Sequence, residues 1–478
     1  MRRGANNKTD AMGNAILAVV VAFLAGCTQT AVSPERIDPI ETAFVVLGVE
    51  GQAVARVVTR SAECPVLVVD EAPHPMTVRA APGTVPLRPT KSPPEESKPS
   101  AFPVLVCEAL LGARTIRASV GGRVLPVPKP EPQRIVVIGD TGCRLKRSDG
   151  VYQACNDRDA WPFEDVALAA AAVHPDLVVH VGDYHYRETA CPAGNAACAG
   201  SPWGYGWETW NADFFAPARK LLQAAPWIVV RGNHESCDRA GQGWWRFLDP
   251  RPLMAASDCN DPANDATGDF SEPYVVPIGD MQFIVFDSAK VGVEPLASGD
   301  PMYRTYSAQM TRAFSLANRH AGLRNLFAVH HPILGFAPDP RQQPTGVYPG
   351  NESLQSVLRP INGASLFPRS IDAVLSGHVH LFEMVSYSTP QPTQLVSGNG
   401  GTWADVPLPS PLPPGATPAA GAAIQSIVST SRPGFLLLER DASAGAAWRI
   451  EARDRRGDPF TTCALADQKT RCAPEALP

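Results

Sequence analysis

The sequence predicts a layered α/β domain preceded by a small all-β domain. From residue 134 onward, short apolar segments rich in branched side chains alternate with stretches of helical periodicity, which is typical of strands buried between layers of helices. Between residues 42 and 127, short β-rich segments are instead separated by clusters of Gly, Pro and Ser. The chain has 478 residues, 44% of them hydrophobic, which is enough for two or three domains with a large core.

The N-terminal all-β region is expected to be a β-sandwich domain over residues 42–130. Its predicted strands are 43–49, 53–59, 65–69, 104–110 and 115–120. The stretch 81–103 is dense in proline and charged residues, so we expect it to be a solvated loop. Pro128, Pro130 and Pro132 mark a stiff boundary with the second domain, residues 131–478.

The second domain contains short apolar segments that are expected to form buried strands. They are residues 134–138, 177–181, 227–230, 283–286, 326–329 and 373–375. Between them, residues 163–173 and 306–319 have the pattern of helices. Near the end of the chain, residues 435–440 and 448–453 are expected to form a hairpin.

The N-terminus has the features of a targeting segment. Arg2, Arg3 and Lys8 precede an apolar run over residues 15–25. This run is too short for a membrane-spanning helix, which needs about 20 apolar residues. We therefore expect residues 1–26 to be a signal peptide.

The apolar run ends in Leu24-Ala25-Gly26-Cys27, which resembles the lipobox of bacterial lipoproteins. The resemblance implies that Cys27 is lipidated and that residues 27–41 form a tether. Thr28 is not the aspartate associated with inner-membrane retention, so the resemblance implies an exported protein anchored in the cell envelope, at the outer membrane or the periplasmic face. The alternative is a plain secretory signal whose cleavage site happens to contain a cysteine.

The other ten cysteines support export, because an even number suits a set of disulfides in an oxidising compartment. Sequence alone does not determine their connectivity. Pairing between neighbours is the simplest expectation: Cys64–Cys107, Cys143–Cys155, Cys191–Cys198, Cys237–Cys259 and Cys463–Cys472. A zinc site would favour C-x-x-C pairs, and the sequence contains none.

The overall charge argues against a nucleic-acid partner. With 42 basic and 47 acidic residues, the formal charge is −5, which gives no basic footprint for binding DNA or RNA. A nucleic acid could be a substrate, but it would not be attracted by bulk charge.

Polar clusters directly follow five of the six strands predicted in the second domain. They are Gly139-Asp140-Thr141-Gly142, Gly182-Asp183-Tyr184-His185-Tyr186, Gly232-Asn233-His234-Glu235, His330-His331-Pro332 and Gly377-His378-Val379-His380. In open α/β sheets the carboxyl ends of the strands line the ligand crevice, so we expect the clusters to converge. Asp, Asn, His and Tyr supply oxygen and nitrogen ligands for hard or borderline metals.

The order of these clusters resembles that of the calcineurin-like metallophosphoesterases, and within them the purple acid phosphatases, across residues 139–380. The resemblance implies a four-layer α/β/β/α domain that holds two metal ions. It assigns Asp140, Asp183, Tyr186 and His380 to the first metal, and Asp183, Asn233, His330 and His378 to the second, so that Asp183 bridges them.

The first cluster departs from the pattern of many relatives, which have a histidine ligand where this chain has Gly142. Tyr186, three residues after Asp183, stands at the spacing at which purple acid phosphatases place a tyrosinate ligand. Because a phenolate favours a trivalent ion, we expect Fe(III) in the first position and Zn, Mn or Fe(II) in the second.

The resemblance implies hydrolysis of a phosphorylated small molecule, with phosphomonoesters as substrates and a metal-activated hydroxide as the attacking group. His234 is the candidate for contacting the phosphate and protonating the leaving oxygen. Arg231 resembles an arginine that grips phosphate in serine/threonine phosphatases, although a salt bridge supporting the strand end explains it equally well. Two other functions remain open: a phosphodiesterase or nuclease on the same site, and a surface binding lipoprotein whose phosphoesterase domain is vestigial.

Overall fold

The computed structural model describes residues 39–320, 322–441 and 447–472. The predicted signal peptide, Cys27 and most of the tether therefore lie outside the described residues. From residue 39 onward the chain forms one compact unit. No helix within the described ranges is long and apolar enough to cross a membrane.

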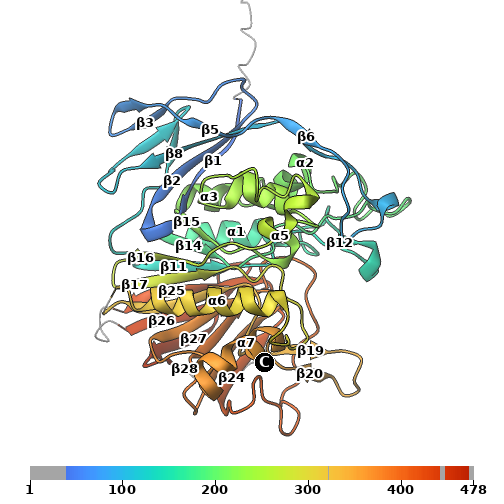
Figure 1. Cartoon of the computed structure of the whole chain (residues 1–478), viewed down its shortest axis with the longest axis vertical. Helices are drawn as coiled ribbons and strands as arrows, with labels where there is room; N and C mark the ends of the chain where they lie inside the picture. Colours follow the sequence, from blue (N-terminus) through green and yellow to red (C-terminus); the bar gives the residue numbers. More distant parts are fainter. Residues whose placement is uncertain (1–38, 321, 442–446, 473–478) are drawn as a thin grey trace, which may run out of the picture. The chain divides into compact units, whose positions relative to one another are not determined.

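The larger of two main sheets contains strands from both ends of the chain. Figure 1 shows it running from the blue N-terminal strands to the red C-terminal strands. In order across the sheet, its strands are β28 (Lys469–Cys472), β27 (Pro459–Ala466), β26 (Ala447–Asp454), β25 (Gly434–Asp441), β11 (Arg134–Ile138), β14 (Leu177–His180), β15 (Trp227–Val229), β1 (Ile40–Leu47), β2 (Ala53–Thr59), β8 (Leu105–Leu111) and β5 (Thr77–Ala80). The central strands β11, β14, β15 and β1 are parallel, and the strands on either side of them pair antiparallel.

The N-terminal region is all-β, and its long strands extend the large sheet. The junction is a parallel pairing of β1 with β15, in which Val46 lies opposite Trp227. A second, four-stranded sheet in this region consists of β10 (Arg123–Leu125), β9 (Ala118–Val120), β3 (Leu67–Val69) and β4 (Ala72–His74). The large sheet thus continues across the proposed domain boundary at residue 130, and a division there stays a prediction.

The second main sheet completes the set of strands predicted for the α/β region. Its order is β16 (Tyr274–Ile278), β17 (Met281–Phe286), β18 (Arg324–Val329), β21 (Ile371–Ser376), β23 (Thr393–Ser397), β22 (Phe382–Tyr387) and β24 (Ile424–Thr430). Of the six strands predicted there, three lie in this sheet and three in the large one. The predicted C-terminal hairpin is the pair β25 and β26.

Helices cover the outer faces of the two sheets. The longest are α1 (Phe163–Ala172), α3 (Arg219–Ala224), α6 (Pro301–Ala317) and α7 (Glu352–Asn362). Shorter elements are α2 (Trp207–Trp210), α4 (Gly241–Gly243), α5 (Asp265–Gly268), β12 (Leu145–Lys146), β13 (Val151–Tyr152), β19 (Ala337–Asp339) and β20 (Gly346–Tyr348). Helix α6 starts where the Asp300 side chain accepts a hydrogen bond from the backbone N–H of Met302, and Pro301 occupies its first position.

The cores on the two faces of each sheet show that the fold has four layers. Successive side chains of a strand point to opposite faces. On β11, Ile135 joins a core shared with Phe283 of the second sheet, whereas Val136 joins the core under α1 and α3. On β17, Ile284 faces away from the large sheet and packs in the core with α6 and α7. The predicted α/β/β/α arrangement is therefore confirmed.

The prediction of a solvated loop over residues 81–103 is only partly correct: most of these residues are exposed and outside regular secondary structure, but the segment also contains packed structure. Within it, β6 (Gly83–Val85) pairs with β7 (Ser100–Phe102) to form a two-stranded ribbon. Val85 and Phe102 are buried, and the Phe102 ring lies 5.9 Å from the ring of Phe247. The charged and proline-rich composition hides a few well-spaced apolar residues that pack onto the helical side of the domain.

All five predicted disulfides are present: Cys64–Cys107, Cys143–Cys155, Cys191–Cys198, Cys237–Cys259 and Cys463–Cys472. Neighbour pairing was the correct expectation because each pair closes a loop within one local stretch of the fold.

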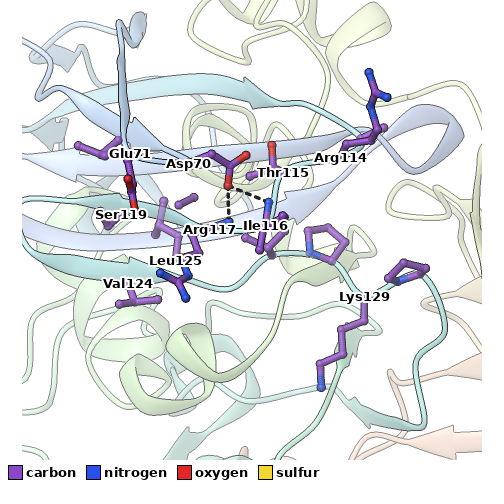
Figure 2. A pocket seen from close by; sticks show the side chains of 16 residues that line it. Asp70, Glu71, Arg114, Thr115, Ile116, Arg117, Ser119, Val124, Leu125 and Lys129 are labelled. Carbon is purple, nitrogen blue, oxygen red and sulfur yellow. Dashed lines mark hydrogen bonds between the residues drawn. The ribbon is translucent and has the colours of Figure 1, made fainter.

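A surface cavity of about 1000 Å³ lies beside the four-stranded sheet (Figure 2). In its wall, Asp70 accepts hydrogen bonds from the backbone N–H groups of Ile116 and Arg117, at 3.0 and 2.8 Å. None of the described residues that the sequence predicts for the site lines this cavity. The large volume of this cavity therefore does not make it the candidate active site.

Candidate metal centre

The polar clusters meet at the carboxyl ends of β11, β14, β15, β18 and β21, and the backbone there is strained. Asp140, Asp183 and His378 have φ angles of 56°, 59° and 69°, in the left-handed region that non-glycine residues rarely adopt. Such strain concentrates at functional sites, because the surrounding structure must hold it in place. The three strained residues are all predicted metal ligands.

Two positions must be glycine because residues of a neighbouring cluster approach the backbone there too closely for a side chain. A methyl group at Gly182 would lie 2.4 Å from Nδ1 of His330, and one at Gly232 would lie 2.1 Å from Oδ1 of Asp183. Both distances are far below van der Waals contact. These two glycines therefore let a neighbouring cluster come close, in addition to letting the chain turn.

The four residues predicted to hold the first metal converge on one point. The Oη atom of Tyr186 lies 2.9 Å from Oδ1 of Asp140, Oδ2 of Asp183 and Nε2 of His380. A phenol has a single proton, so it cannot satisfy three such neighbours at once. The Nδ1 atom of His380 lies 2.8 Å from the backbone oxygen of Trp403, which leaves Nε2 facing the cluster.

The residues predicted for the second metal form an adjoining cluster. The Oδ1 atom of Asn233 lies 3.0 Å from Nε2 of His330 and 3.0 Å from Nδ1 of His378. Nε2 of His330 is also 3.2 Å from Oδ2 of Asp183, and its Nδ1 is 2.8 Å from the backbone oxygen of Val181. Asp183 thus belongs to both clusters.

The electrostatics of these clusters fit bound cations. Asp140 and Asp183 are completely buried, and burial together with the charge of Asp183 raises the pKa of Asp140 well above its usual range. Two buried carboxylates side by side are costly without a positive partner. The donor set of carboxylate, phenol, amide and imidazole groups suits two hard or borderline metal ions.

Glu235 supports the Asp183 loop, a role that the sequence analysis did not assign. Its buried carboxylate accepts hydrogen bonds from the backbone N–H groups of Asp183, Tyr184, His185 and Gly232, at 2.9–3.2 Å. Burial, followed by the charge of Asp183, raises the pKa of Glu235 to about 8. Its place in the same short cluster as a predicted ligand was the available signal.

Asp213 fixes Tyr186 in a similar way, and nothing in the sequence indicates it. Its carboxylate accepts hydrogen bonds from the backbone N–H groups of Tyr186 and Cys143, at 2.7 and 3.0 Å, and from Nε of Arg187 at 2.6 Å.

A methyl group at Gly142 would lie 2.9 Å from the backbone nitrogen of Tyr186. The position that holds a histidine ligand in many relatives therefore has no room for a side chain here.

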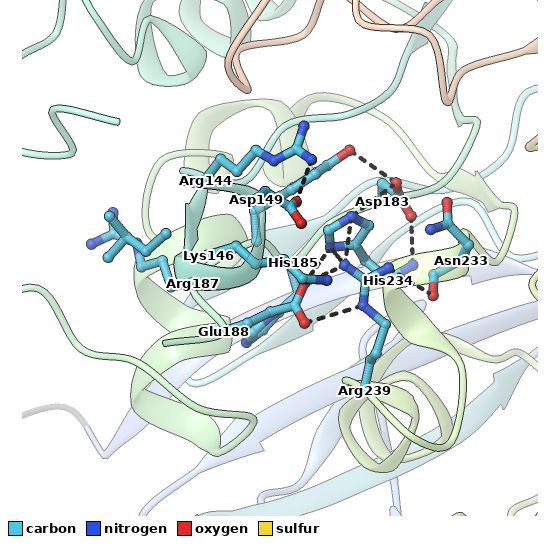
Figure 3. Close-up of polar contacts among 12 residues, drawn as sticks. Arg144, Lys146, Asp149, Asp183, His185, Arg187, Glu188, Asn233, His234 and Arg239 are labelled. Atoms are coloured by element: carbon cyan, nitrogen blue, oxygen red, sulfur yellow. Dashed lines mark hydrogen bonds and ion pairs between the residues drawn. The ribbon is translucent and has the colours of Figure 1, made fainter. Parts of the chain in front are cut away.

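Figure 3 shows His234 in a polar cluster with Glu188 and Arg239. The Nδ1 atom of His234 is 3.0 Å from Oε1 of Glu188, and its ring centroid is 3.9 Å from that of Tyr186. Arg239 pairs with Glu188 and lies 2.8 Å from Nε2 of His234, while Nζ of Lys146 lies 3.3 Å from Glu188. We call Lys146, Glu188, His234 and Arg239 the polar flank of the centre.

Charges within the polar flank set the protonation of its members. Burial and then the charge of Arg239 lower the pKa of His234 to about 3, so the ring is neutral. Burial alone would raise the pKa of Glu188, but the charge of Arg239 and the hydrogen bond with His234 hold it well below its usual range. Lys146 and Arg239 were not predicted from the sequence, because they meet His234 only through the fold.

Arg231 does not face the metal ligands, which corrects the prediction that it grips phosphate. Its guanidinium donates to the backbone oxygens of Glu235 and Gly268 at 2.8 and 2.7 Å, and it lies 3.4 Å from Oδ2 of Asp287. The side chain is 1% exposed. Its position matches the alternative interpretation, a buried ion pair that supports the strand end.

Comparisons with solved structures agree on the fold. The purple acid phosphatase PPD1 from yellow lupin (Lupinus luteus) seeds superposes with a TM-score of 0.54 and 14% identity, covering 88% of this chain and 73% of that one. PhoD superposes with a TM-score of 0.52 and 13% identity, covering 91% and 92%. Among curated proteins, no sequence matches this chain.

The family model of the calcineurin-like phosphoesterases matches residues 133–382. This match covers more than half of the chain and includes every strand end that carries a predicted metal ligand. The chain belongs to the calcineurin-like phosphoesterases.

Proposed function

We propose that this phosphoesterase hydrolyses phosphomonoesters at a centre of two metal ions. The observation that carries the proposal is the arrangement of the clusters around Asp183, whose carboxylate lies within 3.2 Å of both Tyr186 and His330. One shared carboxylate between two groups of ligands is what a pair of neighbouring cations requires.

The proposed ligands divide into two overlapping sets. Asp140, Asp183, Tyr186 and His380 would hold the first metal, and Asp183, Asn233, His330 and His378 the second. A phenolate ligand favours Fe(III) in the first position, with Zn, Mn or Fe(II) in the second. When bound, two such cations lower the pKa of water and neutralise charge that develops on the phosphate.

In this proposal the polar flank contacts the phosphate. Nε2 of His234 lies 3.9 Å from Oδ2 of Asp183, so a phosphate oxygen held beside Asp183 comes within reach of the ring. Arg239 presents its charge at the same ring. In the neutral ring Nδ1–H donates to Glu188, so Nε2 carries no proton of its own. The negative charge of a phosphate would offset that of Arg239 and let Nε2 take up a proton, released by the attacking water, which it passes to the leaving oxygen.

The pairing of nearby cations supports a small phosphomonoester over a nucleic acid or other diester. Lys146 and Arg239 both pair with Glu188, and Nη2 of Arg144 lies 2.6 Å from Oδ2 of Asp149. A basic groove would need cations free to meet backbone phosphates. These three are already bound to carboxylates.

Metal analysis of the purified protein, combined with a substrate panel, tests the proposal. We expect two metal ions per chain and faster hydrolysis of phosphomonoesters than of diesters or pyrophosphate. Faster cleavage of diesters would favour the phosphodiesterase alternative. A protein that neither binds metal nor turns over any ester would support the vestigial one.

The five disulfides suggest an exported protein, and we propose that a lipid on Cys27 anchors it to the cell envelope. Replacing Cys27 by Ser should release the protein from the membrane fraction with its hydrolytic activity intact. Membrane association that persists in this variant would require a different anchor.

A further inference from the structure

A second cavity, of about 440 Å³, opens beside His378 at the metal centre. Its volume is within the usual range of small-molecule sites. Most of its wall is apolar and comes from the loop after β17, the loop after β18 and the hairpin β19–β20. We call five of its apolar residues the apolar flank: Val293, Pro332, Phe336, Tyr348 and Val379.

Part of the apolar flank is exposed to water although its side chains are large. Val293 is 67% exposed and Tyr348 is 38% exposed. Exposed apolar surface that gathers in a concave site is typical of ligand binding, because a ligand that covers it gains from the hydrophobic effect. Its position against His378 places such a ligand next to the proposed second metal.

The charges of the described residues around this cavity disfavour a strongly anionic occupant. The carboxylates of Glu294 and Glu352 belong to lining residues, whereas the one lining guanidinium, that of Arg341, has Nε 3.0 Å from Oδ1 of Asp339. The same guanidinium lies 5.4 Å from the ring centroid of Tyr348, a cation–π contact that restrains the ring. The cavity thus offers an aromatic surface and no surplus positive charge.

We propose that the apolar flank holds the leaving group, and that the substrate is a phosphomonoester whose alcohol carries an uncharged aromatic ring. This inference rests on the proposed function. In the reaction, a water oxygen forms a bond to phosphorus while the bond from phosphorus to the alcohol oxygen breaks. The water gives up a proton, the alcohol oxygen gains one, and the products are the ring-bearing alcohol and inorganic phosphate.

Binding of inert analogues to the metal-loaded protein tests the ring contact without any turnover. Calorimetry should show that phenylphosphonate binds roughly tenfold more tightly than methylphosphonate, which is the size of a good aromatic contact. Tyr348→Ala should remove most of this difference, and Tyr348→Phe should keep it. Ile116→Ala, at a residue of the N-terminal region that is 79% exposed, serves as the control and should leave both affinities unchanged.

Turnover measurements then distinguish two kinds of ring-bearing substrate, an aryl ester and a nucleoside ester. We compare kcat/KM for phenyl phosphate, adenosine 5′-monophosphate and glycerol phosphate in the wild type and in Tyr348→Ala. The substitution should raise KM for the preferred ring-bearing ester roughly tenfold and leave glycerol phosphate unaffected. A larger effect on phenyl phosphate indicates an aryl ester, and a larger effect on the nucleotide indicates a nucleoside ester.

Equal affinities for the two phosphonates, absence of binding of either, or an equal loss for both in Tyr348→Ala would overturn the inference. Failure of the proposed function has a different signature. In that case phenylphosphonate still binds preferentially through Tyr348, but the protein cleaves diesters faster than monoesters.

Discussion

The polar flank and the apolar flank lie against the same metal centre, yet they are built in opposite ways. In the polar flank, Glu188 is 1% exposed and interacts with a lysine, an arginine, a histidine and the hydroxyl of Tyr205. In the apolar flank, Tyr348 is exposed and the cavity in front of it has space for a ligand. One flank is internally satisfied, and the other leaves its surface for a partner to cover.

This difference separates two tasks. A satisfied, buried network holds His234 and Arg239 in one geometry, which suits groups that must meet a phosphate in a fixed orientation. An open apolar wall tolerates ligands of several shapes and distinguishes them by how much surface they bury. We therefore expect changes in the polar flank to act on kcat and changes in the apolar flank to act on KM.

The largest effect is expected at Asp183, the carboxylate that the two ligand clusters share. Asp183→Asn should abolish activity and lower the metal content at both positions, because the substitution keeps the shape but removes the charge shared by the two clusters. Metal analysis and turnover measure this, with the melting temperature as a check that the variant is folded. Full occupancy of both metals in this variant would contradict a bridging role.

Within the polar flank alone, His234→Ala should lower kcat by roughly 10²–10⁴-fold, the usual contribution of acid–base catalysis. The metal content should stay near normal, because His234 is proposed to contact phosphate and not metal. His74→Ala, on an exposed strand of the N-terminal region, is the matched control. Loss of metal from the His234 variant would move this residue into the ligand set.

Tyr186 lies between the polar flank and the residues proposed to hold the first metal, and its role can be measured spectroscopically. If it binds Fe(III) as a phenolate, the oxidised protein should be violet and Tyr186→Phe should bleach it. The phenyl ring can still pack against His234, whose ring centroid is 3.9 Å away, so loss of colour reports on the oxygen atom. An active, iron-containing wild type without a visible band would remove Tyr186 from the first metal.

The smallest effect concerns a carboxyl group behind the apolar flank. Glu383 is buried on β22 and accepts a hydrogen bond from the backbone N–H of Phe336 at 3.0 Å, and burial raises its pKa to about 8. The pKa of Glu383 is thus higher in the folded chain than in the unfolded chain, where it is 4.5. The protonated carboxyl group therefore contributes its full stabilisation below pH 4.5, and this stabilisation is lost as the pH rises through about 8.

Glu383→Gln should remove this dependence. The wild type should lose several degrees of melting temperature between pH 5 and pH 8.5 relative to the variant. Thermal unfolding monitored by circular dichroism at the two pH values measures the difference. Parallel melting curves would mean that Glu383 is ionised in the folded chain.

Local patterns in the sequence predicted six strands of the α/β region and the polar residues that converge at their ends. Each of these six strands is a continuous apolar run, and a polar cluster directly follows five of them, so Asp140 or Asn233 is located by its immediate neighbours. The geometry of Tyr186 was accessible for the same reason, since three residues separate it from Asp183. The strand and the polar cluster that follows it are both encoded within a few residues of chain.

The features that the sequence did not reveal depend on contacts between distant segments. Arg239 meets Glu188 and Asp213 meets Tyr186 only after several strands have been assembled. The orientation of Arg231 could not be inferred, because a guanidinium at a strand end can turn toward phosphate or toward a carboxylate. The pairing of β1 with β15 has no signature, because each strand alone resembles any other buried strand.

That strand order has a consequence for how the protein assembles. β1 can pair with β15 only after β15 has been added to the chain. β11 lies in the middle of the large sheet and pairs with β25, where Arg134 lies opposite Glu439. Pairings between such distant segments form slowly. The disulfides, in contrast, join cysteines only 7 to 43 residues apart and can close as soon as each stretch has emerged. A chain emerging into an oxidising compartment can therefore be crosslinked early but keeps open strand edges until β25 has followed, which exposes it to pairing with other chains and to capture by chaperones.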